Sequence, residues 1–274
     1  MKRHLILTAT LLLVVITTQA QGPISFRDGE EVTYNLYYNW QFVWLKAGTA
    51  SMSTVKKNYN GQEVYCTALT TRGSDKADQY FIMRDTLLCY YLLSDNSPAD
   101  QAVTPVYYRK GAREGKRYYV DEVFYDYPSV GRQHVRQHQL TSKGKHEYRE
   151  QTPKEWVYDM ITMFERARGF DPTGWQKGHK IDFDMVDGHK IETVTIKYLG
   201  KSTVKADNGK KYRCLQLSYL EKEKGKLQEI VRFFVTDDDS HVPVRLDMNL
   251  RVGTAKAFLT SYKGSSSLAE VEVK

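Results

Sequence analysis

Cysteine, proline and long apolar stretches are all scarce in this chain of 274 residues. Its three cysteines form no CxxC pair, which argues against thiol redox chemistry and zinc-finger-like sites. With 18 glycines and 7 prolines, the sequence is neither collagen-like nor of low complexity. Its mean hydropathy is -0.56 and its single long apolar run lies at the N-terminus, which excludes a polytopic membrane protein. Tyrosine is abundant instead, with 20 residues, and a chain with 12% aromatic residues is expected to fold.

Residues 1–20 have the order of a secretory signal peptide. A basic start, Met1–His4, precedes the apolar run Leu5–Ile16, and small residues end at Ala20. The run is too short to span about 30 Å of hydrocarbon, and no cysteine lies near the expected cleavage point to accept a lipid. We expect cleavage after residue 20, a periplasmic or secreted protein, and no transmembrane anchor in the mature chain. The segment holds two of the cations behind the formal charge of +7, so the mature chain is only mildly basic.

Alternating side chains predict β-strands through most of residues 21–274. In Val32–Trp40 every second residue is apolar or aromatic, which is typical of a half-buried antiparallel strand. Turn signals such as Asn60-Gly61 separate further β-rich runs. These runs are Ala47–Val55, Glu63–Thr71, Ala102–Tyr108, Arg117–Tyr125, Thr193–Tyr198, Tyr212–Tyr219, Glu229–Val235, Val242–Leu250 and Lys256–Tyr262. Without a linker or repeat, 21–274 is expected to be one mainly β domain, a large curved antiparallel sheet or a barrel-like wrap.

One packed helix is predicted near residues 153–168. Thr152–Glu155 has the pattern of a capping box with proline at the first helical position, and Gly169 would end the helix. Apolar residues recur between them at helical spacing: Trp156, Val157, Met160, Ile161 and Phe164. Residues 76–92 fit either a strand or a helix, and their aromatic content favours a strand.

Motifs for metal, cofactor or catalytic chemistry are missing. His134 and His138 share one face of a predicted strand but would lie about 13 Å apart, too far to chelate one ion. Asp237–Asp239 lacks the spacing of a calcium loop and is expected to be an acidic turn. GxSxG, GxGxxG and Walker A patterns are absent. We therefore expect no metal and no cofactor, and we assign no catalytic residue.

The three cysteines, Cys66, Cys89 and Cys214, lie in apolar or aromatic surroundings. A disulfide is permitted outside the cytosol, but an odd number leaves at least one thiol free. Buried free thiols are the favoured interpretation, and whether any pair is bonded stays open.

A basic hairpin over residues 107–119 interleaves cations with tyrosines. Nucleic acid is not an expected partner of an exported protein, whereas aromatic rings suit sugars and cations suit lipid phosphates. Lys and Arg side chains that extend over the tyrosines are the favoured structural explanation. Across the chain, polar residues among aromatics give six candidate ligand-binding residues: Arg84, Asp85, Arg117, Tyr119, Asp159 and Arg168.

Arg168 stands out among these candidates. Its helical angle places it near the apolar stripe, where a charge needs a partner. A structural ion pair at the end of the helix is the favoured role.

An ordered set of motifs resembles a bacterial exported family known as domain of unknown function 3108, in its Bacteroidetes-type members. The set comprises Phe26-x-x-Gly29-Glu30-x-Val32-x-Tyr34, Lys46–Ala50, Arg84–Leu87, Arg109-Lys110, Glu114–Tyr118, Asp159, Ala167-Arg168, Gly200-Lys201, Gly209-x-x-Tyr212-x-Cys214, Phe234–Asp238, Pro243–Arg245 and Val252–Ala255. The resemblance implies an exported single β-rich domain. It implies no activity and transfers no catalytic residue.

Three functions are compatible with the sequence. The leading hypothesis is a non-catalytic periplasmic protein whose aromatic-lined concave face binds an apolar or amphiphilic envelope component, a lipid or a glycan. The alternative is a hydrolase of envelope polymers, which requires two acids among Asp85, Asp159 and Asp237 to converge in one cleft. The third is a structural or assembly partner of envelope proteins, with an exposed apolar patch or a free sheet edge. Ligand identity and oligomeric state stay open.

Overall fold

A computed structural model describes residues 28–40, 43–94, 102–129, 131–250, 252–264 and 266–274. The expected signal peptide therefore lies outside the described residues. Within them one sheet of 16 strands dominates, in the order β8-β7-β6-β5-β4-β3-β2-β1-β15-β14-β13-β12-β11-β10-β9, with β16 added beside β12. Neighbouring strands are antiparallel, except for the parallel pair β9 and β10. This is the mainly β, curved antiparallel architecture that the alternating pattern predicts.

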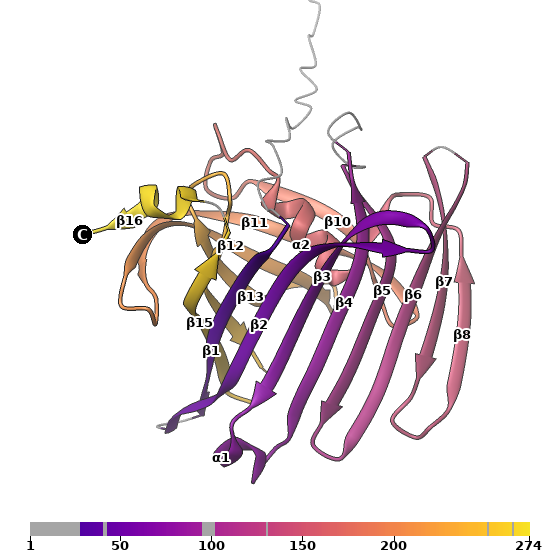
Figure 1. Cartoon of the computed structure of the whole chain (residues 1–274), viewed down its shortest axis with the longest axis horizontal. Coiled ribbons are helices and arrows are strands. Elements are labelled where there is room, and N and C mark those ends of the chain that lie inside the picture. The colour runs from indigo at the N-terminus through magenta and orange to yellow at the C-terminus, as the bar shows by residue number, and fades with distance from the viewer. Residues whose placement is uncertain (1–27, 41–42, 95–101, 130, 251, 265) are drawn as a thin grey trace, which may run out of the picture.

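The first half of the sheet is a meander of eight consecutive strands, which form the front layer in Figure 1. They are β1 (Glu30–Trp40), β2 (Val43–Tyr59), β3 (Gln62–Gly73), β4 (Met83–Leu93), β5 (Val103–Glu114), β6 (Arg117–Ser129), β7 (Arg132–Leu140) and β8 (His146–Gln151). Glycine and asparagine make several of the tight turns; Asn60 and Gly61, for example, both have positive φ between β2 and β3.

The second half curves behind the first and is joined to it by the pairing of β1 with β15. Its strands are β9 (Val157–Tyr158), β10 (Lys180–Asp187), β11 (Lys190–Lys205), β12 (Lys211–Glu223), β13 (Lys226–Thr236), β14 (Pro243–Asn249), β15 (Thr254–Lys263) and, after the 3-10 helix η2 (Ser266–Val271), β16 (Glu272–Val273). Across both halves of the sheet, the sequence pattern predicts most of the strands. It misses β8, β9, β10 and β16, which are short or polar.

Glutamine side chains bridge the two ends of the sheet, which do not pair as strands in the described chain. On β7, Gln133 Nε2 donates to the Val157 carbonyl (3.1 Å) and Gln133 Oε1 accepts from the Val157 N–H (2.7 Å). Gln137 donates to the carbonyl of Gly188 in the β10–β11 turn. A side-chain amide has the same kinds of donor and acceptor as a peptide group. These glutamines therefore bond to backbone groups that strand pairing between the two ends would otherwise satisfy.

The concave interior is filled by the hydrophobic core. One buried cluster joins β4–β7 to β9–β11 and α2, and a second joins β1 and β2 to β12–β15. Many tyrosines belong to these clusters: Tyr34, Tyr91, Tyr108, Tyr125, Tyr158, Tyr212 and Tyr219. Protein interiors are packed as densely as organic crystals, so these rings stabilise the wrap rather than line a binding surface.

The packed helix, α2 (Met160–Arg168), is shorter than the predicted range of 153–168. Its N-cap is Asp159, whose Oδ1 accepts from the N–H groups of Ile161 (2.9 Å) and Thr162 (3.0 Å). The prediction of a cap at residue 152 is wrong because the Val157 backbone is bound by Gln133, and residues 157–158 pair with β10. A carboxylate that accepts two helical N–H groups is a strong cap.

The segment 76–92 contains both predicted alternatives. One helical turn, α1 (Asp75–Asp78), is capped by Ser74, and β4 begins at Met83. All three cysteines are free and buried, which confirms the favoured interpretation. No helix in the described ranges is long and apolar enough to cross a membrane.

Candidate functional site

The six predicted site residues lie in different places. Asp159 and Arg168 occupy the two ends of α2 inside the wrap. Asp85 and Tyr119 lie on the inner face of the front layer, where both are in register with Ala112. Arg84 lies on the outer face of β4, opposite Arg113. Arg117 is exposed at the start of β6, opposite Glu114 and on the same face as Tyr119. The structure therefore offers a buried group and a surface group of polar residues.

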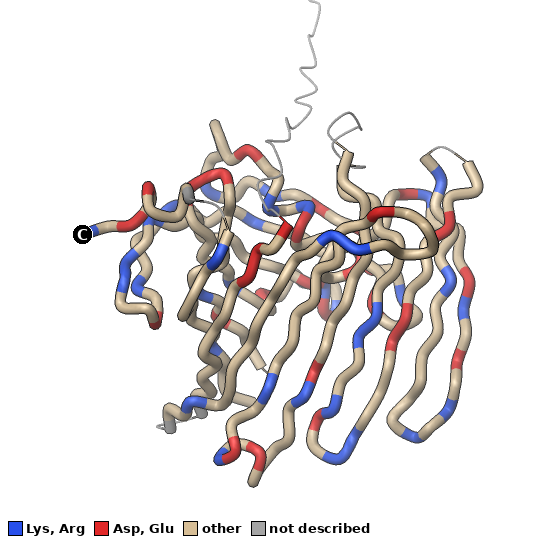
Figure 2. The backbone as a smooth tube through the Cα atoms, viewed as in Figure 1, with Lys and Arg blue, Asp and Glu red and all other residues tan. Residues whose placement is uncertain are grey.

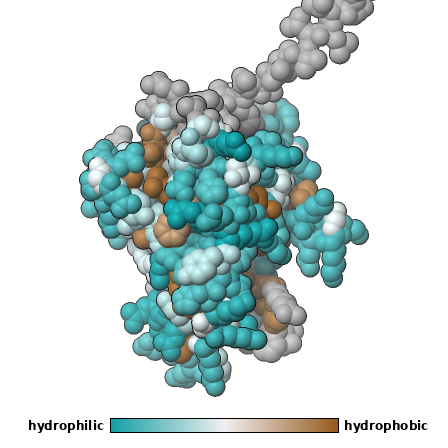
Figure 3. Space-filling model, turned by 90° about the vertical axis from the view of Figure 1, so that its right-hand side faces the viewer, coloured by the Kyte–Doolittle hydropathy of each residue, from teal (hydrophilic) through white to brown (hydrophobic). Residues whose placement is uncertain are grey.

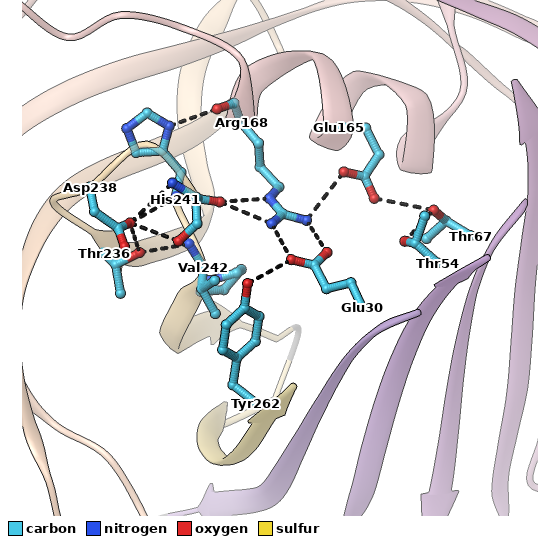
Figure 4. A network of polar contacts seen from close by, with 12 residues as sticks. Glu30, Thr54, Thr67, Glu165, Arg168, Thr236, Asp238, His241, Val242 and Tyr262 are labelled. Carbon is cyan, nitrogen blue, oxygen red and sulfur yellow. Dashed lines mark hydrogen bonds and ion pairs between the residues drawn. The ribbon is translucent and has the colours of Figure 1, made fainter. Parts of the chain in front are cut away.

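The buried group is centred on Arg168 (Figure 4). Its guanidinium donates to both carboxylate oxygens of Glu30, at 2.8 and 2.7 Å. It also donates to the Ser240 carbonyl, at 3.1 and 2.9 Å, and to Glu165 Oε2 at 3.3 Å. The Arg168 and Glu30 side chains are only 3% and 1% exposed. Arg168 thus ties α2 to β1 and to the β13–β14 turn, in the structural ion pair that its position predicts.

Glu165, one turn earlier on α2, is fully buried beside this pair. Burial raises the pKa of its carboxyl to about 7, although the nearby Arg168 charge favours the ionised form. Its second oxygen accepts from the Thr67 hydroxyl of β3 at 3.3 Å. Two carboxylates facing one guanidinium would leave a net buried negative charge, and a proton on Glu165 removes it.

The acidic turn also serves the buried group. Asp238 Oδ1 accepts from the Thr236 hydroxyl (2.6 Å) and from the N–H groups of Ser240 and His241 (both 3.2 Å). His241 Nδ1 lies 2.7 Å from the carbonyl oxygen of Arg168. The run is therefore an ordered turn, as predicted, and the described residues hold no cluster of three potential metal ligands.

The carboxylates proposed for a hydrolase do not converge. Asp159 lies 3.4 Å from the Cys89 thiol, and Cys89 is four residues, about 13 Å, along β4 from Asp85. Asp237 pairs with Lys201 in the other half of the sheet. Burial also raises the pKa of the Cys89 thiol well above its usual value, so this cysteine is a poor nucleophile.

The surface group surrounds a hollow of about 620 Å³ on the outer face of β4, β5 and β6, which we call the basic pocket. It is lined by Arg84, Thr86, Arg109, Gly111, Arg113, Lys116 and Tyr118. In the sheet register Arg84 lies opposite Arg113, and Arg113 opposite Tyr118, so these side chains share one face. Figure 2 shows blue segments gathered at the lower ends of these strands.

A missing side chain shapes the pocket floor. A Cβ atom placed on Gly111 would lie 2.9 Å from Nη1 of Arg109, so the Arg109 side chain lies along β5 directly over this glycine. The Nε atom of Arg109 is 3.9 Å from the nearest oxygen of Glu122. Gly111 therefore lets the Arg109 guanidinium reach into the pocket.

The pocket cations differ in their counter-ions. Arg84 is held by Asp78 of α1, with Nη1 2.9 Å from Oδ1. Arg113 and Lys116 are exposed and make no ion pair within the described part of the chain. The lining contains four cations and no acid, so its positive charge is only partly compensated.

An aromatic stripe adjoins the basic pocket on the same outer face. It consists of Tyr59, Tyr90, Tyr107 and Phe124, with ring centroids 4.6 Å apart for Tyr59–Tyr90 and 5.0 Å apart for Tyr107–Phe124. Tyr90 lies opposite Tyr107, two residues along the strands from Arg109. A polar end and an apolar end thus follow each other along β4 and β5.

Sequence reasoning identified part of this surface. Arg84 was among the candidates, and Tyr118 and the cations of β5 and the β5–β6 turn belong to the basic hairpin. Lys110 does extend over a tyrosine as predicted, 5.4 Å from the Tyr119 ring centroid. The prediction missed that Arg109 and Arg113 face the opposite side of the sheet. Glu30 and Glu165 were missed as partners of Arg168.

The fold defines an incompletely closed, β-barrel-like protein. It is similar to the crystal structure of a "Beta-barrel-like Protein of Domain of Unknown Function DUF1849 from Brucella abortus", with a TM-score of 0.52 and 12% identity, over 88% of this chain and 100% of that one. At this identity the likeness concerns the fold alone. The model of the family described as "Protein of unknown function (DUF3108)" matches residues 33–260, and the chain belongs to this family. No curated protein matches the chain significantly.

Proposed function

We propose that this chain is an exported, non-catalytic binding protein whose basic pocket takes the anionic group of an amphiphilic envelope component. The ligand class is a phosphate or carboxylate attached to a lipid or to a glycan. The carrying observation is a hollow lined by four cations and no acid, in which Arg113 and Lys116 have no counter-ion among the described residues. An anion bound between them would relieve their repulsion and meet the planar forks of the arginines.

The aromatic stripe supports an amphiphilic rather than a purely ionic ligand. Stacked rings beside a charged pocket suit an acyl chain or a sugar face next to its anionic group. The packed interior directs this proposal to the outer face instead of the concave face. Export is supported by the signal-like order of residues 1–20.

The two alternatives have less support. A hydrolase would need converging carboxylates, and the three candidate acids lie apart. An assembly partner would need an exposed apolar patch or a free sheet edge. The edge strand β8 reads His-Glu-Tyr-Arg-Glu-Gln, and charged edge strands resist pairing. Figure 3 views the molecule from the side on which β8 lies in Figure 1, and this face is mostly hydrophilic.

Isothermal titration of the mature protein with short-chain lipids below their micelle concentration tests the proposal. We expect dihexanoyl phosphatidylglycerol to bind more tightly than dihexanoyl phosphatidylcholine, and inorganic phosphate to bind weakly, because the stripe contributes to the lipid alone. The Arg113→Ala/Lys116→Ala variant should lose at least tenfold in affinity. The control Lys222→Ala/Lys226→Ala removes two exposed cations of the β12–β13 hairpin and should bind like the wild type. Equal affinity of the pocket variant and the wild type, or no binding of either lipid, would refute the proposal.

A further inference from the structure

Exposed apolar side chains gather at one end of the sheet. We define the apolar rim as Trp44, Tyr80, Phe81, Tyr118, Leu250 and Val252, which are six of the ten exposed large hydrophobic residues in the described chain. Tyr80 and Phe81 are 87% and 55% exposed. Single exposed apolar residues are ordinary, but here six of them lie at one end of the sheet, and four of the six are aromatic, the residue type favoured at a membrane interface.

The strand order explains why these residues share one end. Trp44 lies opposite Asn39 at the end of β1, and Asn39 lies opposite Thr254, next to the β14–β15 turn that holds Leu250 and Val252. Tyr80 and Phe81 lie between α1 and β4, and these turns form the lower edge of the molecule in Figure 1.

Cations accompany the apolar rim. Lys76, Arg113, Lys116 and Arg117 are exposed there and make no ion pair with described residues. The acids of this end are mostly engaged: Asp78 binds Arg84, and Glu114 accepts from the Tyr119 hydroxyl at 3.0 Å. Asp75 is the exposed acid of α1. The rim therefore combines aromatic tips with an excess of positive charge.

The rim is also continuous with the basic pocket. Tyr118 and Lys116 line the pocket and belong to the β5–β6 turn region. The Phe81 ring lies 3.4 Å from where a Cβ of Gly115 would be, so the Tyr80–Phe81 loop packs beside the same turn. A surface seated against the rim would therefore adjoin the opening of the pocket.

We propose that the apolar rim docks onto the surface of an anionic lipid bilayer. Tyr80 and Phe81 enter the headgroup region, where aromatic side chains are favoured, and the four cations meet lipid phosphates. A bilayer fits better than a protein partner because the apolar side chains stand on separate turns and strand ends, with cations among them. The docked protein would then collect its ligand directly from the membrane. This last step rests on the proposed function, whereas the docking itself does not depend on it.

Vesicle sedimentation tests the docking. The mature protein should sediment with vesicles of one part phosphatidylglycerol to three parts phosphatidylcholine, and much less with phosphatidylcholine alone. The Tyr80→Ser/Phe81→Ser variant should lose at least fivefold in bound fraction. The control Tyr148→Ser changes a residue of β8 that is 75% exposed and should sediment like the wild type.

Titration of the same rim variant with dihexanoyl phosphatidylglycerol separates the two proposals. Retained short-chain binding with lost vesicle binding supports docking by the rim. If the rim variant sediments like the wild type, or the wild type ignores anionic vesicles, docking is wrong whatever the pocket binds. Loss of short-chain binding in the Arg113→Ala/Lys116→Ala variant reports on the pocket alone.

Discussion

Replacing Glu165 by glutamine should remove the contribution of this buried carboxyl to the pH dependence of the free energy of unfolding. The carboxyl is buried between Glu30 of β1, Arg168 of α2 and the Thr67–Tyr91 hydroxyls of β3 and β4. Glutamine keeps the shape of the protonated acid. Its carbonyl can still accept from Arg168, and its amide can donate to the Thr67 hydroxyl, which accepts as well as donates. The Glu165→Gln variant should therefore fold normally.

The magnitude follows from proton linkage. The ordinary pKa of a glutamate is 4.5, and burial raises the pKa of Glu165 to about 7. Between these values the folded state holds a proton that the unfolded chain releases, so the free energy of unfolding falls as pH rises. At about 1.4 kcal/mol per pH unit, the wild type should lose about 2.5 kcal/mol from this group between pH 5 and pH 8.

Urea unfolding at pH 5, 6, 7 and 8 measures this loss. The stability of the variant relative to the wild type should rise by about 2.5 kcal/mol over this range, because other titrating groups are common to both proteins. The matched control is Glu63→Gln, which changes a carboxylate that is 71% exposed. It should keep a constant difference from the wild type. A constant difference for Glu165→Gln as well would refute the assignment of a proton to this site.

Three further predictions concern the pocket, the ion pair and the thiols. Gly111→Ala places a Cβ 2.9 Å from Nη1 of Arg109 and should displace that flexible side chain. Titration should then show about fivefold weaker binding of dihexanoyl phosphatidylglycerol, while Tm shifts by no more than ~2 °C. Unchanged affinity would contradict the role of Gly111. Arg168→Ala leaves Glu30 buried without its partner and should lower the free energy of unfolding, measured in urea at pH 7, by about 3–5 kcal/mol. A loss below about 1 kcal/mol would contradict the stabilising role of the Arg168–Glu30 ion pair. Burial raises the pKa of the Cys214 thiol to about 12, and it also raises the pKa of the Cys66 and Cys89 thiols. Ellman's reagent should therefore modify no cysteine in the folded protein and all three in guanidinium. Rapid reaction of the folded protein would show that a thiol is accessible.

Local patterns predicted the strands because a half-buried strand repeats every two residues, and Val32–Trp40 shows that repeat without any knowledge of its partners. The start of α2 could not be decided locally. Thr152 and Asp159 are both good capping residues, and the choice depends on Gln133, which binds the backbone of Val157 from 24 residues away. A capping signal in the sequence is therefore not sufficient to place the start of a helix.

Long-range contacts limited the prediction of the sites. The helical angle of Arg168 showed that it needs a partner, but Glu30 lies 138 residues away and no local rule connects them. The basic hairpin was visible as a run of cations. Which of them share a face depends on the register of β5 with its neighbours, which turns Arg109 and Arg113 outward and Lys110 toward Tyr119.

The most direct test of the central claim is an NMR titration of the arginine Nε–H signals in the mature protein with dihexanoyl phosphatidylglycerol. The account predicts saturable shifts for Arg109 and Arg113, a smaller shift for Arg84, which is already paired with Asp78, and none for the buried Arg168. Shifts confined to residues outside the basic pocket, or no saturable shift at all, would contradict it.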